Sequence, residues 1–200
     1  IYALITIAIF GMWYYARYEG NFLPSPKKTF NPMMIVAIVI LVPGTQFAAN
    51  FIANLTGYIR PDWLQQYNEL FETSGITDTT FVTVLYSVIL APICEELIFR
   101  GVTMRCARKA LPFALANLMQ AALFGLFHLN WIQGIYAFAL GIVLGYVCER
   151  GGSIYYSMGL HLLFNLWGTL SGFFPDPGNS VVVFVVVIVV TIVSLVAGFV

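Results

Sequence analysis

Long apolar stretches alternate with short polar passages along this chain, and each stretch is about the length of a membrane-crossing helix. At about 1.5 Å per helical residue, about 20 apolar residues cross a hydrocarbon core of roughly 30 Å. The pattern therefore predicts an all-α, polytopic transmembrane helical bundle that forms one domain over residues 1–200. Its seven visible spans are expected at residues 1–18, 33–57, 81–104, 112–131, 133–148, 153–174 and 181–200.

One long passage, residues 58–80, departs from this pattern because it is mostly polar. Large apolar residues recur in it at helical spacing behind Pro61, with Asp62 in the capping position. This spacing predicts a short helix lying in the membrane interface, within an extramembrane loop. A substrate gate is the alternative interpretation. The apolar residues are Trp63, Leu64, Tyr67, Leu70 and Phe71.

Two features inside the spans concern helix shape and packing. Pro43 followed by Gly44 is expected to kink the second span and not to end it, because neighbouring helices can satisfy the freed backbone groups. Small residues on one side of the fifth span predict close packing against another helix. These residues are Gly134, Gly141 and Gly145.

The composition supports an integral membrane protein. Hydrophobic residues make up 60% of the chain, charged residues make up 9%, and the mean hydropathy is +0.87. The net charge is zero and no run is rich in lysine or arginine, so no nucleic-acid partner is expected and the lipid bilayer is. The three cysteines show no CxxC spacing and are interpreted as free thiols.

Lysine and arginine residues are distributed unevenly between the two sides of the predicted bundle. Seven lie in loops on one side, with Arg100 near that end of its span, and only Arg60 lies on the other. Cytoplasmic loops carry the excess of these residues, so the first side is expected to be cytoplasmic. The seven are Arg17, Lys27, Lys28, Arg105, Arg108, Lys109 and Arg150.

Ionisable side chains inside the predicted spans are the candidates for chemistry, because such groups are costly in hydrocarbon and are seldom kept without a use. Glu96 and Arg100 are four residues apart on one helix face and are expected to pair. Glu95 is turned about 100° from Glu96 and is expected to stay free of this pair. His161 and Asn165 are also four apart and are expected to point into a shared cavity.

These residue types suit the hydrolysis of a carbonyl compound. A carboxylate and a nearby imidazole could deprotonate an attacking water, and Glu95 with His128 suits that role. Hydrogen-bond donors would stabilise the oxyanion that forms, and His161 with Asn165 suits that role. Phe124 lies one turn before His128 on the same face.

Three short motifs carry a resemblance to a known family. EELIFR at 95–100 fits EExxxR, FGLFH at 124–128 fits FxxxH, and HLLFN at 161–165 fits HxxxN. In this order and in this membrane context the chain resembles the CPBP family of intramembrane proteases, also called Abi or CAAX-protease-like. The resemblance implies a CAAX-protease-like catalytic core over residues 81–170. That family commonly has three spans before the first motif and this chain has two, so about eight spans are expected in the intact protein.

The resemblance implies an intramembrane endopeptidase that hydrolyses a peptide bond of a membrane-associated protein or peptide. By position in the motifs, Glu95 would be the general base with His128, and His161 and Asn165 would stabilise the oxyanion. Substrates of the family include prenylated CAAX tails in eukaryotes and signalling or bacteriocin-like peptides in bacteria. The expected location is the plasma membrane of a prokaryote. The supporting residues would be Glu96, Arg100 and Phe124.

The metal requirement stays open at this point. The family was first classed as metal-dependent, and a water activated by glutamate and histidine without metal is also proposed for it. The chain has no HExxH motif, and no obligatory cofactor is expected. If zinc or another divalent metal is present, the expected ligands are Glu95, His128 and His161.

Two other functions are alternatives to proteolysis. Some members of the resembled family are thought to act without catalysis, as the partner of another membrane protein or as a bacteriocin immunity protein. A proton-coupled transporter could use Glu95 and the histidines as a relay, but the sequence lacks the symmetry of inverted repeats.

The predicted span limits place Glu95 and His128 at different depths in the membrane, although the two are expected to be partners. With these limits Glu95 lies about 14 residues, or roughly 21 Å, from the outer end of its span. His128 lies only about three residues, or roughly 5 Å, from the outer end of its own span. We therefore expect the third span to be shifted towards residues 88–109, so that the two side chains meet.

Overall fold

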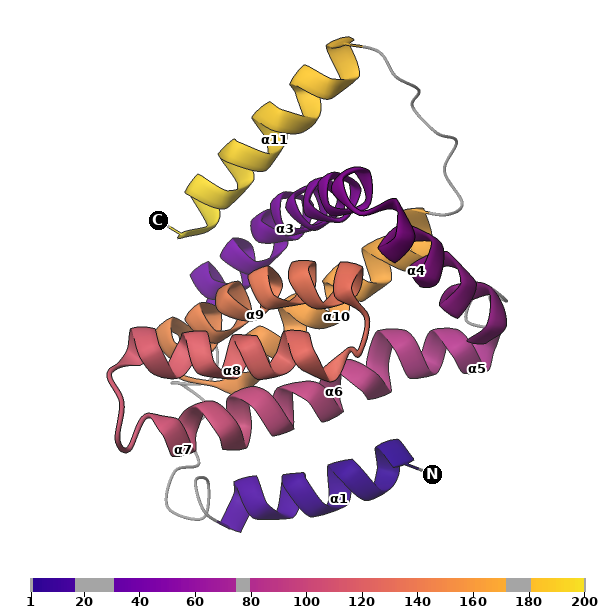
Figure 1. Ribbon diagram of the computed structural model, residues 1–200. Helices are drawn as coiled ribbons and strands as arrows, with labels where there is room; N and C mark the ends of the chain where they lie inside the picture. Colours follow the sequence, from indigo (N-terminus) through magenta and orange to yellow (C-terminus); the bar gives the residue numbers. More distant parts are fainter. Residues whose placement is uncertain (1, 17–30, 75–79, 172–180, 200) are drawn as a thin grey trace.

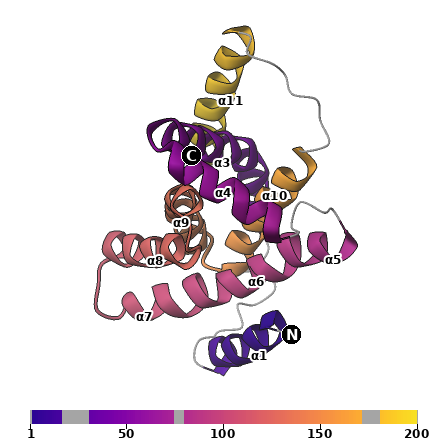
Figure 2. The same cartoon turned by 45° about the vertical axis from the view of Figure 1, so that its right-hand side comes forward.

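The computed structural model describes residues 2–16, 31–74, 80–171 and 181–199, and every regular element in these residues is a helix. The helices form an elongated bundle in which α1 (Tyr2–Tyr14) and α11 (Val181–Phe199) lie on opposite sides (Figure 1, Figure 2). α1 packs against the helix that carries the two glutamates, and α11 packs against α3 (Pro32–Ile59). The predicted all-α bundle is confirmed.

The other helices follow the predicted spans in order. The third span is one continuous helical segment, Phe81–Ala107, in which α5 (Phe81–Val84), α6 (Ala91–Glu96) and α7 (Arg105–Ala107) alternate with two π-helical segments. Then come α8 (Phe113–Phe127), α9 (Trp131–Gly151) and α10 (Ile154–Ser171). α8 is shorter than the predicted span at 112–131, because the chain turns after Phe127 and Leu129 adopts a φ of 53°.

Length and composition identify an integral, multi-pass membrane protein. Within the described residues, three helices are long and apolar enough to cross a membrane: Pro32–Ile59, Phe81–Ala107 and Trp131–Gly151. Three further apolar helices are shorter: Tyr2–Tyr14, Phe113–Phe127 and Val185–Phe199. All seven predicted spans thus have a helical counterpart, although not every counterpart reaches the full length of a span.

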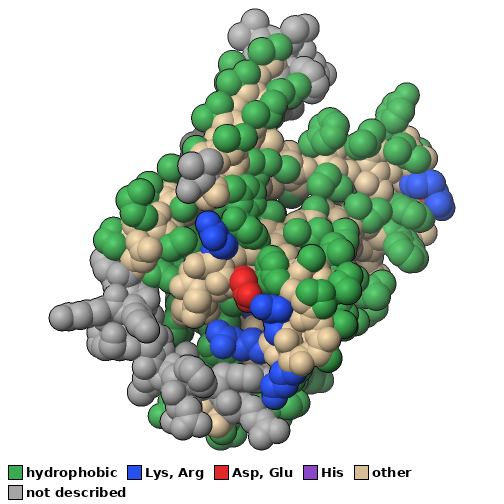
Figure 3. All heavy atoms as spheres, turned by 90° about the vertical axis from the view of Figure 1, so that its left-hand side faces the viewer, with side chains coloured by type: hydrophobic (Ala, Val, Ile, Leu, Met, Phe, Trp, Pro, Cys, Tyr) green, Lys and Arg blue, Asp and Glu red, His purple; other side chains and the backbone are tan. Residues whose placement is uncertain are grey.

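Basic side chains gather at the end of the bundle where α7 meets α8, and Figure 3 shows them around an acidic one. Arg60 precedes α4 (Pro61–Ser74), at the opposite end of the bundle in Figure 1. This separation is the one that the uneven distribution of lysine and arginine predicts. Arg17, Lys27 and Lys28 lie outside the described residues. The basic residues at the α7 end are Arg105, Arg108, Lys109 and Arg150.

The helix α3 continues through Pro43, as predicted, and a side chain of α11 makes this possible. Gly44 N donates to Ser194 Oγ at 3.0 Å, and Ser194 Oγ donates in turn to the carbonyl of Ile40. The hydroxyl therefore stands between a backbone donor and the acceptor four residues earlier, which would bond directly in a regular helix. A neighbouring helix satisfies the backbone groups that the proline region leaves open.

The predicted close packing of glycines joins α8 to α9. A Cβ atom at Gly141 would lie 3.1 Å from Ala121, and one at Gly134 would lie 3.0 Å from the carbonyl oxygen of Gly125. A side chain at Gly145 would collide with Asn117. These positions need glycine because the two helices approach closely, as small residues allow in membranes.

The predicted interfacial helix is α4, and part of its apolar stripe contacts the bundle. Trp63 stacks on Trp131 at the start of α9, with ring centroids 5.3 Å apart, and the Arg60 guanidinium lies 4.2 Å from the Trp63 ring. The phenol groups of Tyr67 and Tyr136 are hydrogen-bonded. Burial at this contact raises the pKa of the Tyr67 phenol. The helix α4 therefore covers the outer end of α9.

Candidate active site

The two adjacent glutamates lie near the middle of the long helix, between two widened turns. π-helical turns cover Leu85–Leu90 and Leu97–Met104, on either side of α6. Pro92 lies in the first turn of α6 and has no N–H, so it cannot make the hydrogen bond that an α-helix requires there. π-helical turns inside helices are frequent at functional sites because they change which way the side chains point.

Glu96 and Arg100 form the predicted pair, and both side chains are completely buried. Arg100 Nη1 donates to Glu96 Oε1 at 2.8 Å, and Arg100 Nη2 donates to the carbonyl of Gly141 at 3.2 Å. The guanidinium also lies over the face of Phe124, 4.5 Å from its centroid. These contacts join the long helix to α8 and α9.

His161 of α10 lies between the two glutamates. Its Nδ1 is 2.9 Å from Glu96 Oε1, and its Nε2 is 3.6 Å from Glu95 Oε2. A carboxylate can only accept, so Nδ1 donates to Glu96. Among the described residues Glu95 forms no ion pair with Arg100, so it stays free of the Glu96–Arg100 pair, although the His161 ring lies beside it. Glu95 also differs from Glu96 in exposure, because 16% of its side chain is exposed and none of the Glu96 side chain is.

Phe124 brings the second histidine to the same place. The Phe124 ring is nearly perpendicular to both imidazole rings, with its centroid 4.9 Å from that of His128 and 5.7 Å from that of His161. His128 Nδ1 lies 2.8 Å from the Phe124 carbonyl oxygen and donates to it, which leaves Nε2 as the acceptor nitrogen of the neutral ring. Within the described residues His128 forms no ion pair with either glutamate.

Asn165 follows His161 by one turn on α10, and its amide holds α10 against the long helix. Asn165 Nδ2 donates to the carbonyl of Ser87 at 2.8 Å. The side-chain nitrogen of an asparagine has two hydrogens, so one N–H remains for another acceptor. Asn165 is half-buried, whereas His161 is buried.

The depth disagreement between Glu95 and His128 has a simple structural reason. The expected shift of the third span towards residues 88–109 is wrong, because the helix runs from Phe81 to Ala107. With 27 residues against 15 in α8, it extends well beyond the end of α8 that carries His128 (Figure 1). The two residues therefore lie at different distances from their own helix ends while their motifs meet at Phe124.

The described residues do not form a ready set of metal ligands. No group of three or more His, Cys, Asp or Glu side chains among them is arranged to hold a metal ion. His161 Nδ1 is engaged by Glu96, and only its Nε2 faces Glu95. The set of Glu95, His128 and His161 therefore does not fit a three-ligand zinc site in this conformation.

Two supporting contacts were not predicted in detail. The Gly141 carbonyl accepts from Gln120 Nε2 at 2.8 Å as well as from Arg100, so an interhelical amide shares the acceptor of the buried cation. The Tyr136 phenol of α9 is hydrogen-bonded to Tyr67 and so connects α9 to α4. Neither Gln120 nor Tyr136 is part of a motif. An amide side chain inside an apolar span predicts that Gln120 forms an interhelical hydrogen bond, which is confirmed, whereas nothing in the sequence indicates Tyr136.

A comparison with protein-family models gives one match. Residues 77–167 match the model described as type II CAAX prenyl endopeptidase Rce1-like, a protease family. The matched segment covers a little under half of the 200 residues and includes all three motifs. No curated protein and no solved structure gives a significant match.

Proposed function

We propose that this chain is an intramembrane endopeptidase that cleaves a membrane-associated protein or peptide, because residues 77–167 match the family model of type II CAAX prenyl endopeptidases. One observation carries the proposal. His161 contacts both glutamates of another helix inside a membrane bundle. Its Nδ1 lies 2.9 Å from Glu96 Oε1, 65 positions away in sequence, and its Nε2 lies 3.6 Å from Glu95 Oε2. Ionisable groups collected in this way inside a membrane protein are a functional site by default.

In this proposal Glu95 and His128 activate the attacking water. Glu95 is the more exposed of the two glutamates, so it can reach water and substrate where Glu96 cannot. His128 has its Nδ1–H engaged by the Phe124 carbonyl, so its Nε2 is free to take or return a proton. The water loses a proton to this pair as its oxygen bonds to the substrate carbonyl carbon. The same proton can then pass to the leaving amine.

His161 and Asn165 supply the donors for the oxyanion. His161 Nδ1 donates to Glu96, so Nε2 can donate to the oxyanion only when the ring carries a proton on both nitrogens. In that state Glu95, Glu96, Arg100 and His161 together have no net charge, which is the least costly condition inside a membrane. Asn165 contributes the N–H that Ser87 does not use. Glu96 and Arg100 act by holding His161 in place.

Cleavage by protein in liposomes tests the proposal. The reconstituted chain is given a farnesylated peptide ending in a CAAX sequence and a set of unprenylated membrane-bound peptides, and the products are identified by mass spectrometry. Glu95→Gln keeps the shape of the side chain but removes the proton acceptor, so the cleavage rate should fall by about 10²–10⁴-fold. The matched control is Glu72→Gln, at an exposed position of α4, which should cleave like the wild type.

Circular dichroism of both variants shows whether the helices are intact. Equal cleavage by wild type and Glu95→Gln would refute the assignment of the base. Failure of the wild type to cleave any of these peptides would count against an endopeptidase. A cellular effect that persists in Glu95→Gln would favour a non-catalytic role instead.

A further inference from the structure

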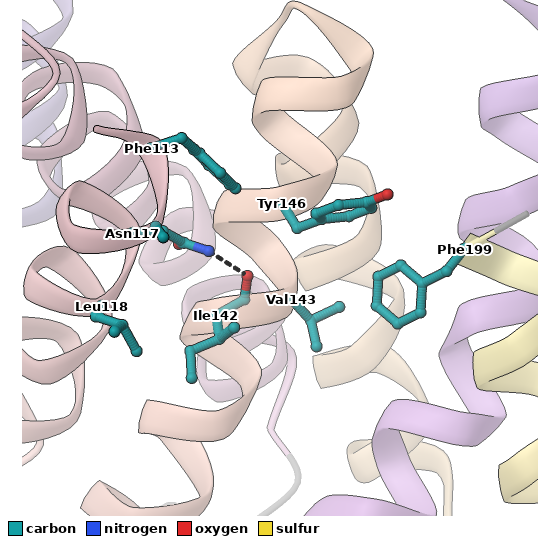
Figure 4. A pocket seen from close by; sticks show the side chains of 8 residues that line it. Phe113, Asn117, Leu118, Ile142, Val143, Tyr146 and Phe199 are labelled. Atoms are coloured by element: carbon teal, nitrogen blue, oxygen red, sulfur yellow. Dashed lines mark hydrogen bonds between the residues drawn. The ribbon is translucent and has the colours of Figure 1, made fainter.

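An apolar groove lies on the lipid-facing side of the bundle, away from the candidate active site. It has a volume of about 380 Å³ and lies between α8, α9 and the last residue of α11 (Figure 4). Phe113 and Leu118 come from α8, Val143 and Tyr146 from α9, and Phe199 closes it by meeting Tyr146 edge to face at 5.0 Å.

The groove offers hydrocarbon contacts and little else. The amide of Asn117 is already engaged, since it donates to the Ile142 carbonyl at 3.0 Å and accepts from Gln120 at 2.7 Å. Leu118 at its edge is 45% exposed, so the groove opens to the surroundings of the bundle. In a membrane protein these surroundings are lipid chains, and a chain can enter from the side.

Basic groups stand at the end of the groove nearest the membrane surface. The Arg108 guanidinium is 5.9 Å from the Phe113 ring, and the Arg150 guanidinium is 6.0 Å from the Tyr146 ring. Arg108 also lines a neighbouring polar cavity of about 410 Å³ together with Arg105 and Glu149. Figure 3 shows this end of the molecule, where the blue side chains outnumber the red.

The charge at this end is clearly positive. Among the described residues it carries Arg105, Arg108, Lys109 and Arg150 against Glu149 alone. Glu149 accepts from Arg108 Nη2 at 3.1 Å, but both side chains are more than one third exposed, so their mutual attraction is weakened by water. The four cations exceed the one anion at this end, so its net charge attracts an anion.

We propose that this groove binds an anionic phospholipid, with one acyl chain between α8, α9 and α11 and the phosphate group at Arg108 and Arg150. The order of chemistry along the groove matches such a lipid, since apolar walls are followed by two aromatic rings and then by two guanidinium groups. Basic pockets between membrane helices bind phosphate headgroups in this manner. A neutral lipid or an apolar helix of another protein would make no use of the arginines.

Lipid retention and thermal stability in detergent test this site. The purified chain is mixed with phosphatidylglycerol, with phosphatidylcholine of the same acyl chains, or with inorganic phosphate. Native mass spectrometry measures retained lipid, and circular dichroism measures the melting temperature. Phosphatidylglycerol should be retained and should raise the melting temperature, because it binds the folded state. Phosphatidylcholine should bind much less, and inorganic phosphate alone should have no effect.

Variants separate the two parts of the site. Arg108→Gln and Arg150→Gln should each weaken phosphatidylglycerol binding about fivefold, the share expected for one basic residue at an anionic headgroup. Val143→Phe should fill the groove and weaken retention with the charges intact. Arg60→Gln is the matched control at the opposite end and should bind like the wild type.

Four outcomes would overturn the proposal. Equal retention of the two lipids by the wild type would show that the basic residues do not select an anionic headgroup. Equal retention of phosphatidylglycerol by the wild type and the arginine variants would show the same. Full stabilisation by inorganic phosphate would show that the groove is not used. A change of oligomeric state in Val143→Phe, measured by light scattering after size exclusion, would show that the groove holds a second copy of the chain.

Discussion

The buried pair of Glu96 and Arg100 makes the strongest prediction about stability. Both side chains have no exposed surface, and their shortest contact is 2.8 Å. Removing one member of a buried pair leaves the other charge without compensation, which typically costs about 3–5 kcal/mol. Arg100→Met and Glu96→Gln should therefore each lower the free energy of unfolding by an amount in this range.

The contacts that each variant keeps decide which of the two loses more free energy of unfolding. After Arg100→Met, Glu96 keeps the N–H of His161 at 2.9 Å, so we expect a loss near 3 kcal/mol. After Glu96→Gln, Arg100 keeps its full charge and no carboxylate compensates it, because the amide oxygen of the glutamine, the Gly141 carbonyl and the Phe124 ring carry no net charge, so we expect about 5 kcal/mol. The double variant contains neither buried charge and should lose about 5 kcal/mol, well below the sum of the single losses.

Reversible unfolding in mixed micelles with increasing dodecyl sulfate, followed by circular dichroism, measures these losses. The coupling between the two sites should be about 3 kcal/mol, the upper end of values for residues in direct contact. Asp62→Asn is the control, since the Arg60–Asp62 pair is about half exposed and should not affect unfolding measurably. Losses that add within about 0.5 kcal/mol would refute the inference that the two charges depend on each other.

Two further predictions use the same unfolding measurement. Ser194→Ala removes the hydroxyl that bonds Gly44 N and should cost about 1–3 kcal/mol; an unchanged midpoint would mean that α3 closes its own hydrogen bond. Gly145→Val places a side chain against Asn117, which forces α8 and α9 apart and should cost about 1–3 kcal/mol of unfolding free energy. Gly159→Ala is the control and should be tolerated, because the nearest atom to a Cβ at Gly159 is 3.9 Å away. Equal losses for the two glycine variants would contradict the close packing.

The features that could be predicted from the sequence are those that depend on local spacing. Apolar length indicates the helices, and a separation of four residues on one helix brings Glu96 to Arg100 whatever the rest of the fold does. The interruption at Pro43 was also predictable as a feature that a neighbour must repair. Which neighbour does so was not, because Ser194 lies 150 residues further along the chain in an otherwise uniform valine-rich segment.

For contacts between helices, the sequence predicts which residues belong to the site but not which of them pair. The motifs indicate that both histidines and both glutamates belong to one site, but they do not say which histidine lies beside which glutamate. The structure places His161 against both glutamates and attaches His128 to its own helix through the Phe124 carbonyl. Such pairing depends on helix rotation and relative height, and an error of a few residues in a helix end changes the height by several Å.

Chain direction and burial together indicate how the three motifs divide their work. The long helix runs towards the basic end of the bundle, and α8 and α10 run away from it. Arg100 is consequently the deepest member towards that end, and it is completely buried. His128 and Asn165 lie one turn further towards the α4 end than their motif partners, and both are half-buried.

Between these levels lie three buried side chains, Glu96, Phe124 and His161, which fasten the helices to one another. Exposure therefore increases from Arg100 towards the end covered by α4, in all three motifs at once. In the proposed endopeptidase, the substrate approaches from that end, because the opposite direction is filled by a buried ion pair and an aromatic ring. In that proposal each motif connects a residue that holds the bundle together to one that can meet substrate, and the two are four positions apart in FxxxH and HxxxN and five apart in EExxxR.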